Sequence, residues 1–212
     1  GLTRWFIKRF RRLHPRWIHA LLEIRTAYLN KSIHEAIDSS KKTRIISLGA
    51  GYDMRCTRLL SSGKLDECYE VDLPEAVSAK KKLFQERLLR RRTGAKVPSM
   101  IPLDLSNVAA FEDLLCNITK NEPADEWNTI FVVEGVLMYL QEDFACEILQ
   151  ACANYSSPTA VLCFADRLDN VKEVDLLQIE AELYRSGGWQ LCDWCPCPTA
   201  NARHMGTARK RI

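Results

Sequence analysis

Apolar positions along the chain recur at two spacings, and the two kinds of segment alternate. Short segments at residues 43–48, 68–71, 99–102, 128–133 and 159–164 are expected to be strands, and the one at 128–133 is a nearly continuous apolar run of the kind found in buried parallel strands. Apolar residues at helical intervals fill longer segments, at residues 74–92, 111–119, 141–154 and 171–185. A shorter helix is expected to end near Leu60, and a sixth strand is expected at residues 189–194. This alternation predicts an α/β fold, a doubly wound and mostly parallel sheet with helices on both faces.

The 212 residues are enough for a single domain with one sizeable core. Helical spacing dominates from about residue 2 to residue 38, with Pro15 as a break or a first-turn residue. We therefore predict an N-terminal helical segment, residues 1–40, that packs on a domain formed by residues 41–212. No apolar run approaches the roughly 20 residues that a membrane-spanning helix needs.

The most specific local pattern is the strand at residues 43–48 and the turn Gly49-Ala50-Gly51 that follows it. Strand, glycine turn and helix in this order form the cofactor-binding end of a doubly wound sheet. Glycine allows the backbone to approach a ligand because no Cβ stands in the way. Met54 occupies the third glycine position of a dinucleotide motif, which argues against tight pyrophosphate binding. A ligand without phosphates fits the shorter turn, and S-adenosylmethionine (SAM) is the cofactor that we predict.

Acidic residues recur where the predicted strands end. Asp72 comes about 20 residues after the glycine turn, where a carboxylate can accept both hydroxyls of a ribose. The alternative is that Asp72 only caps the helix that begins at Pro74. Ligands of such sheets bind beyond the carboxyl ends of the strands. This rule predicts a site at the following positions: Gly49, Gly51, Asp72, Asp104, Glu134 and Asp166.

Five stretches together resemble the leucine carboxyl methyltransferase family of SAM-dependent enzymes. They are RTAY at 25–28, ISLGAGYDMR at 46–55, EVDLP at 70–74 with Lys80, Asp104-Leu105, and EGVLMYL at 134–140. Their order and spacing are those of the family, and they cover roughly residues 20–165. The resemblance implies a Rossmann-like methyltransferase fold with SAM as the cofactor.

The resemblance also implies roles at the methionine end of the cofactor. Arg25 would pair with the methionine carboxylate, which a guanidinium fork fits well. Glu134 would lie near the methionine amino group, and Gly49 and Gly51 would let the backbone approach. Without the resemblance, Arg25 would be an ordinary exposed helix residue and Glu134 a carboxylate at a helix N-terminus.

At the nucleoside end, the resemblance implies three further contacts. Asp72 would hold the ribose. Asp104 would accept a hydrogen bond from the adenine amino group, while the amide of Leu105 would meet a ring nitrogen.

The chain departs from the family pattern after Phe164, where the segment available for the family's closing antiparallel hairpin is brief. No stretch matches the family lysine upstream of Arg25, and Lys8 is the candidate for this position. His204 is the late candidate for a general base, and the alternative is a loop or surface histidine. Because substrate choice usually rests on such divergent parts, the acceptor stays open.

Composition bears on the partners, the cellular compartment and the metal content of the protein. A net charge of +3 is too small to indicate nucleic acid as a partner. The first sixteen residues are rich in arginine, which is compatible with an organelle transit sequence, a membrane-surface helix or a basic helix that packs on the domain. Nine cysteines without regular spacing favour a reducing, cytoplasmic compartment over a disulfide framework. Cys192, Cys195 and Cys197 have only His204 nearby as a further zinc ligand, so we predict no metal site.

Methyl transfer from a sulfonium is an in-line displacement, for which the protein mostly supplies alignment and a dry site. A carboxylate acceptor is ionised at pH 7 and needs no general base. We therefore predict a SAM-dependent methyltransferase acting on a carboxylate, such as the C-terminal leucine of a protein, with Arg25 and Glu134 as candidate catalytic residues. The alternatives are a small-molecule O-methyltransferase of the same family, a SAM-binding homologue without turnover, and an NAD-dependent oxidoreductase, which Met54 disfavours.

Overall fold

The computed structural model describes residues 16–91, 95–120, 126–168, 175–196 and 204–210. Its strands are β1 (Lys42–Leu48), β2 (Glu67–Asp72), β3 (Ser99–Pro102), β4 (Trp127–Glu134), β5 (Val161–Asp166), β6 (Trp189–Pro196) and β7 (His204–Lys210). Its helices are α2 (Arg16–Ala36), α3 (Arg55–Ser61), α4 (Pro74–Arg91), α5 (Val108–Thr119), α6 (Glu142–Asn154) and α7 (Leu176–Arg185), with the short 3-10 helix η1 (Leu137–Tyr139).

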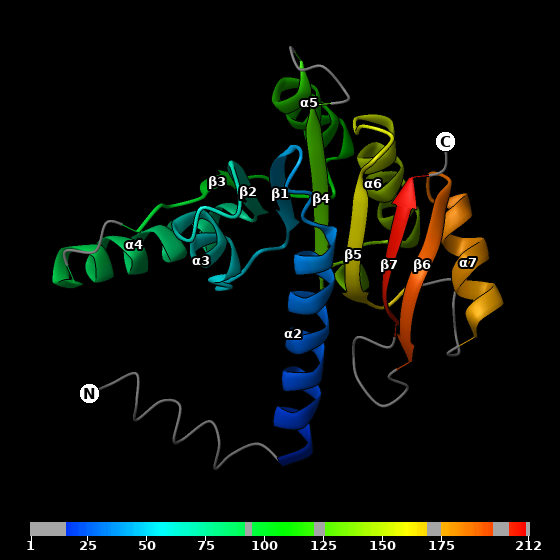
Figure 1. Ribbon diagram of the computed structural model, residues 1–212, viewed down its shortest axis with the longest axis horizontal. Helices are drawn as coiled ribbons and strands as arrows, with labels where there is room; N and C mark the ends of the chain where they lie inside the picture. The colour runs from blue at the N-terminus through cyan, green and yellow to red at the C-terminus, as the bar shows by residue number, and fades with distance from the viewer. Residues whose placement is uncertain (1–15, 92–94, 121–125, 169–174, 197–203, 211–212) are drawn as a thin grey trace.

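The strands form one sheet in the order β3-β2-β1-β4-β5-β7-β6 (Figure 1). Strands β1 to β5 pair in parallel, so the predicted doubly wound and mostly parallel sheet is confirmed. The strand order reverses between β1 and β4. In sheets of this kind, ligands bind at such a reversal, beyond the carboxyl ends of the strands.

Strand β7 is the element that the sequence pattern does not predict. It lies between β5 and β6 and runs antiparallel to both. Its sequence, HMGTARK, offers few apolar side chains, and a Cβ on Gly206 would lie 2.7 Å from the ring of Phe164. The strand is therefore held by backbone pairing and by small residues that allow close approach, and neither feature appears as a pattern of apolar residues. The closing hairpin forms within a segment that the sequence analysis treats as brief.

Helices cover both faces of the sheet (Figure 1). On one face, α5, α6 and α7 pack on β-strand residues such as Phe131 and Phe164, and Trp189 completes this core. On the other face, α2 contributes Leu29 and Ile33 to a second core that includes α3. Helix α2 therefore packs Leu29 and Ile33 against the sheet, and this brings Arg25 to the edge where the parallel strands end.

Helix starts follow side-chain caps more closely than apolar spacing. The helix predicted from residue 111 begins at Val108, because Asn107 accepts a hydrogen bond from the amide of Ala110 at 3.2 Å. In the last helix, Asp175 accepts a hydrogen bond from the amide of Leu177 at 2.9 Å, and helix α7 starts after it. The predicted residues 171–174 lie outside the described part of the chain.

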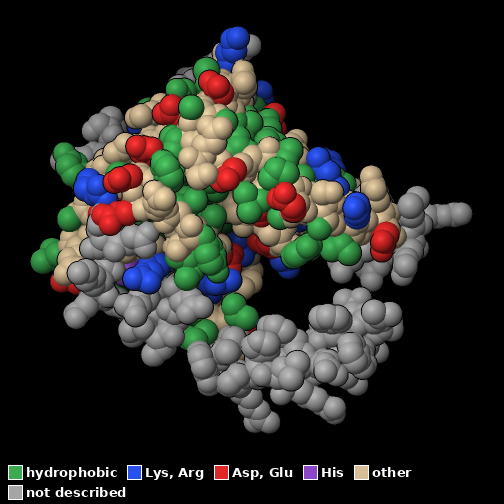
Figure 2. Space-filling model, turned by 180° about the vertical axis from the view of Figure 1, so that it is seen from behind, with side chains coloured by type: hydrophobic (Ala, Val, Ile, Leu, Met, Phe, Trp, Pro, Cys, Tyr) green, Lys and Arg blue, Asp and Glu red, His purple; other side chains and the backbone are tan. Residues whose placement is uncertain are grey.

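One face of the described part carries side chains of mixed character. On the face drawn in Figure 2, acidic and basic side chains are interspersed among apolar ones instead of being gathered by sign. Among the described helices, none is both long enough and apolar enough to cross a membrane.

Candidate functional site

The turn after β1 has the geometry that only glycine adopts readily. Gly49 and Gly51 have φ of +59° and +45°. The amide of Gly49 donates to the carbonyl of Val71 at 2.8 Å, which fixes the turn to the end of β2. A Cβ on Gly49 would lie 2.6 Å from Cγ2 of Val136, whereas a Cβ on Gly51 would meet nothing within 4 Å.

Two hollows meet at Gly49. The first has a volume of about 620 Å³, and its walls come from the ends of β2 and β3, from the loop after β4 and from the start of α6. The second has a volume of about 320 Å³ and lies between the glycine turn, α2 and the end of β4. Together they form a trough along the carboxyl ends of the strands, where the sheet topology places a ligand.

All seven residues predicted to hold the cofactor line this trough. The first hollow has Asp72, Asp104 and Leu105, the second has Arg25, Gly51 and Glu134, and Gly49 lines both. They come from segments that are far apart in sequence. The contacts that each would make with a ligand stay predictions.

Asp72 holds the glycine turn as well as lining the trough. Its Oδ2 accepts a hydrogen bond from the amide of Gly51 at 2.6 Å, and its Oδ1 accepts one from the amide of Leu73 at 2.8 Å. The carboxylate therefore ties the end of β2 to the turn after β1. This differs from the alternative of a simple helix cap, because the long-range contact is to the turn and not to α4.

Asp104 lies at the open side of the first hollow. Its Oδ1 accepts hydrogen bonds from the amide and the hydroxyl of Ser106, at 2.9 Å and 2.8 Å. These bonds hold the pKa of the Asp104 carboxyl below its ordinary value. Asp104 is therefore ionised and suited to accept a hydrogen bond, while the side chain of Leu105 is buried beside it.

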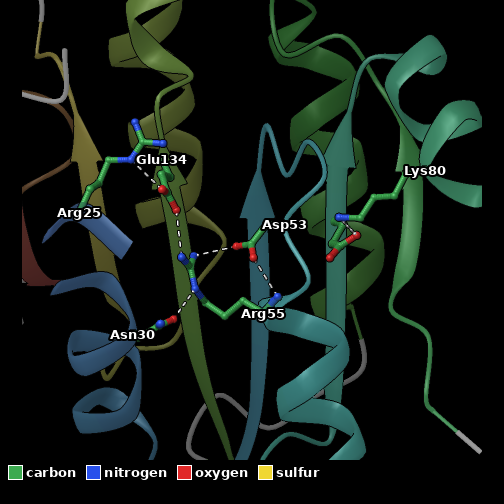
Figure 3. A network of polar contacts seen from close by, with 7 residues as sticks. Arg25, Asn30, Asp53, Arg55, Lys80 and Glu134 are labelled. Carbon is green, nitrogen blue, oxygen red and sulfur yellow. Dashed lines mark hydrogen bonds and ion pairs between the residues drawn. The ribbon is translucent and has the colours of Figure 1, made fainter. Parts of the chain in front are cut away.

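The second hollow is bordered by an ionic network that the sequence analysis only partly anticipates (Figure 3). Nε of Arg25 donates to Oε1 of Glu134 at 2.7 Å, and Nη2 of Arg55 donates to Oε2 of Glu134 at 3.0 Å. Arg55 also pairs with Asp53 at 2.9 Å and donates to Asn30 at 2.8 Å. The sequence alone gives no role to Arg55, Asp53 or Asn30, although Asp53 and Arg55 lie in the family-like stretch at residues 46–55. The fixed spacing of that acid and base was the available signal.

A second ion pair lies deeper, between β2 and α4. Nζ of Lys80 is 2.7 Å from Oε2 of Glu70, and both residues are almost completely buried. Burial raises the pKa of the Glu70 carboxyl, and the nearby Lys80 partly offsets this. The pair joins the strand that carries Asp72 to the helix that follows it.

Asp166 does not take the ligand-facing position that the strand-end rule predicts. It is fully buried and accepts hydrogen bonds from the amides of Val136, Leu137 and Met138, at 2.6, 2.9 and 3.2 Å. It also accepts one from its neighbour Arg167. Burial raises the pKa of the Asp166 carboxyl, and these amide bonds partly offset the rise. Asp166 instead shapes the loop after β4 that forms one wall of the trough.

The residues near the C-terminal end that were candidates for a general base or a metal site lie away from the trough or outside the described residues. His204 is fully buried in β7, and its Nδ1 accepts a hydrogen bond from the amide of Leu168 at 3.0 Å, so it is neither a surface histidine nor a residue of either hollow. Cys192 is exposed and Cys195 is half-buried. Cys197 and Lys8 lie outside the described residues, and within the described ranges no three metal-ligating side chains come together.

The trough fits a ligand with two unlike ends. The first hollow combines leucine and phenylalanine side chains with the carboxylates of Asp72 and Asp104, which suits a nucleoside. The second hollow presents both signs of charge through Arg25 and Glu134, which suits a zwitterionic amino acid. The backbone at Gly49 lies between them without a side chain. SAM has this arrangement of groups, so the residues present fit the predicted cofactor.

The two glycines of the turn should respond differently to substitution. Replacing Gly49 with alanine should lower the free energy of unfolding by about 2–3 kcal/mol, because a positive φ costs about 1–2 kcal/mol and overpacking adds to it. Gly51→Ala should lose only about 1–2 kcal/mol, since its Cβ would meet open space. Urea unfolding of both variants measures the difference, and equal losses would contradict the close contact between Gly49 and Val136.

Comparison with known proteins gives one family. The family model described as leucine carboxyl methyltransferase matches residues 7–153. An inferred S-adenosyl-L-methionine-dependent methyltransferase of Frankia alni is 29% identical over 178 residues, which are 81% of this chain and 60% of that protein. The leucine carboxyl methyltransferase 1 homolog of Arabidopsis thaliana is 29% identical over 138 residues, which are 57% of this chain and 39% of that protein. The chain thus spans less than two thirds of the length of either relative.

Solved structures agree in fold. The crystal structure of an S-adenosylmethionine-dependent methyltransferase from Clostridium acetobutylicum superposes with a TM-score of 0.57 over 99% of both chains. Sequence identity is 13%, so this likeness concerns the fold. The sheet topology, the motifs along the trough and the match over most of the chain agree, and the chain belongs to the leucine carboxyl methyltransferase family.

Proposed function

We propose that this chain binds SAM along the trough and is a methyltransferase that acts on a carboxylate, with the C-terminal leucine of a protein as the acceptor. The observation that carries the proposal is the meeting of the two hollows at Gly49, with a nucleoside-like lining on one side and a zwitterion-like lining on the other. The family name and the names of the two relatives support the reaction class.

Different residues of the trough bind the two ends of the cofactor. Asp72 and Asp104 accept hydrogen bonds from the nucleoside, and Arg25 and Glu134 pair with the charged groups of the amino-acid end. The bound cofactor supplies an activated methyl group. What remains for the protein is to orient the acceptor and to exclude water from it.

The lining of the trough supports a carboxylate acceptor. The described residues that line the two hollows include no histidine, lysine or cysteine. The carboxylates of Glu134 and Asp104 already have partners, since Glu134 pairs with two arginines and Asp104 accepts two hydrogen bonds from Ser106. A carboxylate, with an ordinary pKa of about 4, is in general a weak base at neutral pH. An acceptor that is already ionised at neutral pH needs none.

The rim of the first hollow favours a second candidate, an aromatic small molecule methylated on oxygen. Tyr139 is 79% exposed and Leu73 is 48% exposed, and both line the hollow. An apolar rim of this kind would accommodate a ring as readily as a leucine side chain.

Methyl-labelled SAM separates the candidates. The chain should transfer label to a peptide that ends in leucine but not to the same peptide with a C-terminal amide, and the product should release volatile methanol in mild base, as methyl esters do. Label in a base-stable product with phenolic acceptors would favour the small-molecule candidate. Binding of SAM without transfer to any acceptor would indicate a homologue without turnover and would contradict the proposal.

A further inference from the structure

Arg55 is a buried charged side chain at the wall of the second hollow. Only 6% of its side chain is exposed, and every nitrogen of its guanidinium has an assigned partner. Nε donates to Asn30, Nη1 pairs with Asp53, and Nη2 donates to Glu134. Its own backbone amide also donates to Asp53, at 2.9 Å. Arg55 thereby joins helix α2, the glycine turn and the end of β4 at one point (Figure 3).

Arg25 holds the same carboxylate in a different way. Its side chain is 25% exposed, and it contacts Glu134 through Nε. Within the described part of the chain, its two terminal nitrogens have no hydrogen-bond partner. One oxygen of Glu134 is therefore held by a buried arginine whose three guanidinium nitrogens all have partners, and the other by a more accessible arginine that contacts it through Nε alone.

This asymmetry suits an exchange of ion pairs. A ligand with an ammonium and a carboxylate can take Arg25 as partner for its carboxylate and Glu134 as partner for its ammonium. Each charge in the hollow then keeps an opposite partner, so no buried charge is left uncompensated. The exchange requires that Glu134 stay in place while Arg25 leaves it, and Arg55 is the side chain that can hold it.

We propose that Arg55 is a positioning residue for the amino-acid end of the cofactor, holding Glu134 in a fixed geometry while Arg25 changes partners. The inference rests on the proposed binding of SAM. It gives Arg55 no contact with the ligand. A merely structural Arg55 would affect the whole trough, whereas a positioning role affects only the part that binds the amino acid.

Two ligands distinguish these roles. S-adenosylhomocysteine (SAH) has the nucleoside and the amino-acid end, and 5′-methylthioadenosine has the nucleoside alone. In calorimetric titrations, Arg55→Met should weaken SAH binding roughly 10- to 100-fold. This is the loss expected when a displaced Glu134 no longer makes its charged hydrogen bond to the ligand ammonium. The affinity for 5′-methylthioadenosine should stay within about twofold of the wild-type value. Arg58→Met, an exposed position on the same helix, is the matched control and should change neither.

Equal losses for both ligands, or no loss for SAH, would overturn the positioning role. Should Arg55→Met fail to fold, Asn30→Ala removes one acceptor of Arg55 and leaves the charges in place. It should weaken SAH binding several-fold without affecting the nucleoside, and equal or absent effects would again overturn the role. If the wild-type chain binds 5′-methylthioadenosine but not SAH, the inference fails with the proposed cofactor. If wild-type binding is normal and only the selectivity of the variants is wrong, the inference alone fails.

Discussion

Replacing Asp72 with alanine is expected to weaken the binding of SAH by roughly 100-fold or more. Two ribose hydroxyls would lose a charged acceptor, and each such hydrogen bond is worth about 1.5–3 kcal/mol. The substitution also removes the acceptor of the Gly51 amide, which loosens the turn between the two hollows. Isothermal titration at one fixed salt concentration measures the loss.

Two further variants test the cause of that loss. Asp113→Ala removes an exposed carboxylate on α5, outside the trough lining, and should leave the affinity unchanged. Asp72→Asn keeps the shape but not the charge and should fall between the wild type and Asp72→Ala. An affinity of Asp72→Ala within about threefold of the wild type would contradict the assignment of Asp72 to the ribose, since even one lost bond should exceed that change.

The largest effect on stability is expected at Asp166. Asp166→Ala should lower the free energy of unfolding by about 3–5 kcal/mol, because several backbone amides would lose a buried acceptor at once. Three of these amides belong to consecutive residues of the loop after β4, so the wall of the trough should loosen as well. Urea unfolding followed by circular dichroism measures the change.

Asp175→Ala is the matched comparison, because Asp175 also accepts amide hydrogen bonds but lies at an exposed helix start. Its loss should be about 1 kcal/mol, as for other helix caps. If the two substitutions lower the free energy of unfolding equally, the buried acceptor role of Asp166 is wrong.

The parallel sheet could be predicted because its central strands are buried on both faces. Strand β4 is buried from Trp127 to Val133, and such strands appear in sequence as continuous apolar runs. The glycine turn could be predicted as well, since glycine adopts the positive φ found at Gly49 far more readily than other residues. Both features depend on short segments of sequence.

The network around Arg55 could not be predicted in the same way. An arginine at the start of a helix is ordinarily exposed, and its burial depends on Glu134, which is 79 residues away. Asp166 shows a related limit. The strand-end rule places its backbone correctly, but the direction of its carboxylate is decided by amides about 30 residues earlier in the chain. Strand β7 could not be predicted from apolar spacing, because most of its residues are small or polar. Its place in the sheet is set by pairing with β5 and β6.

Calorimetric titration of the intact chain with SAM, and separately with NAD, tests the central claim most directly. The arrangement of the two hollows predicts saturable, one-to-one binding of SAM, competition by SAH and no binding of NAD. Binding of NAD in preference to SAM, or no binding of SAM, would contradict the cofactor site described for this trough.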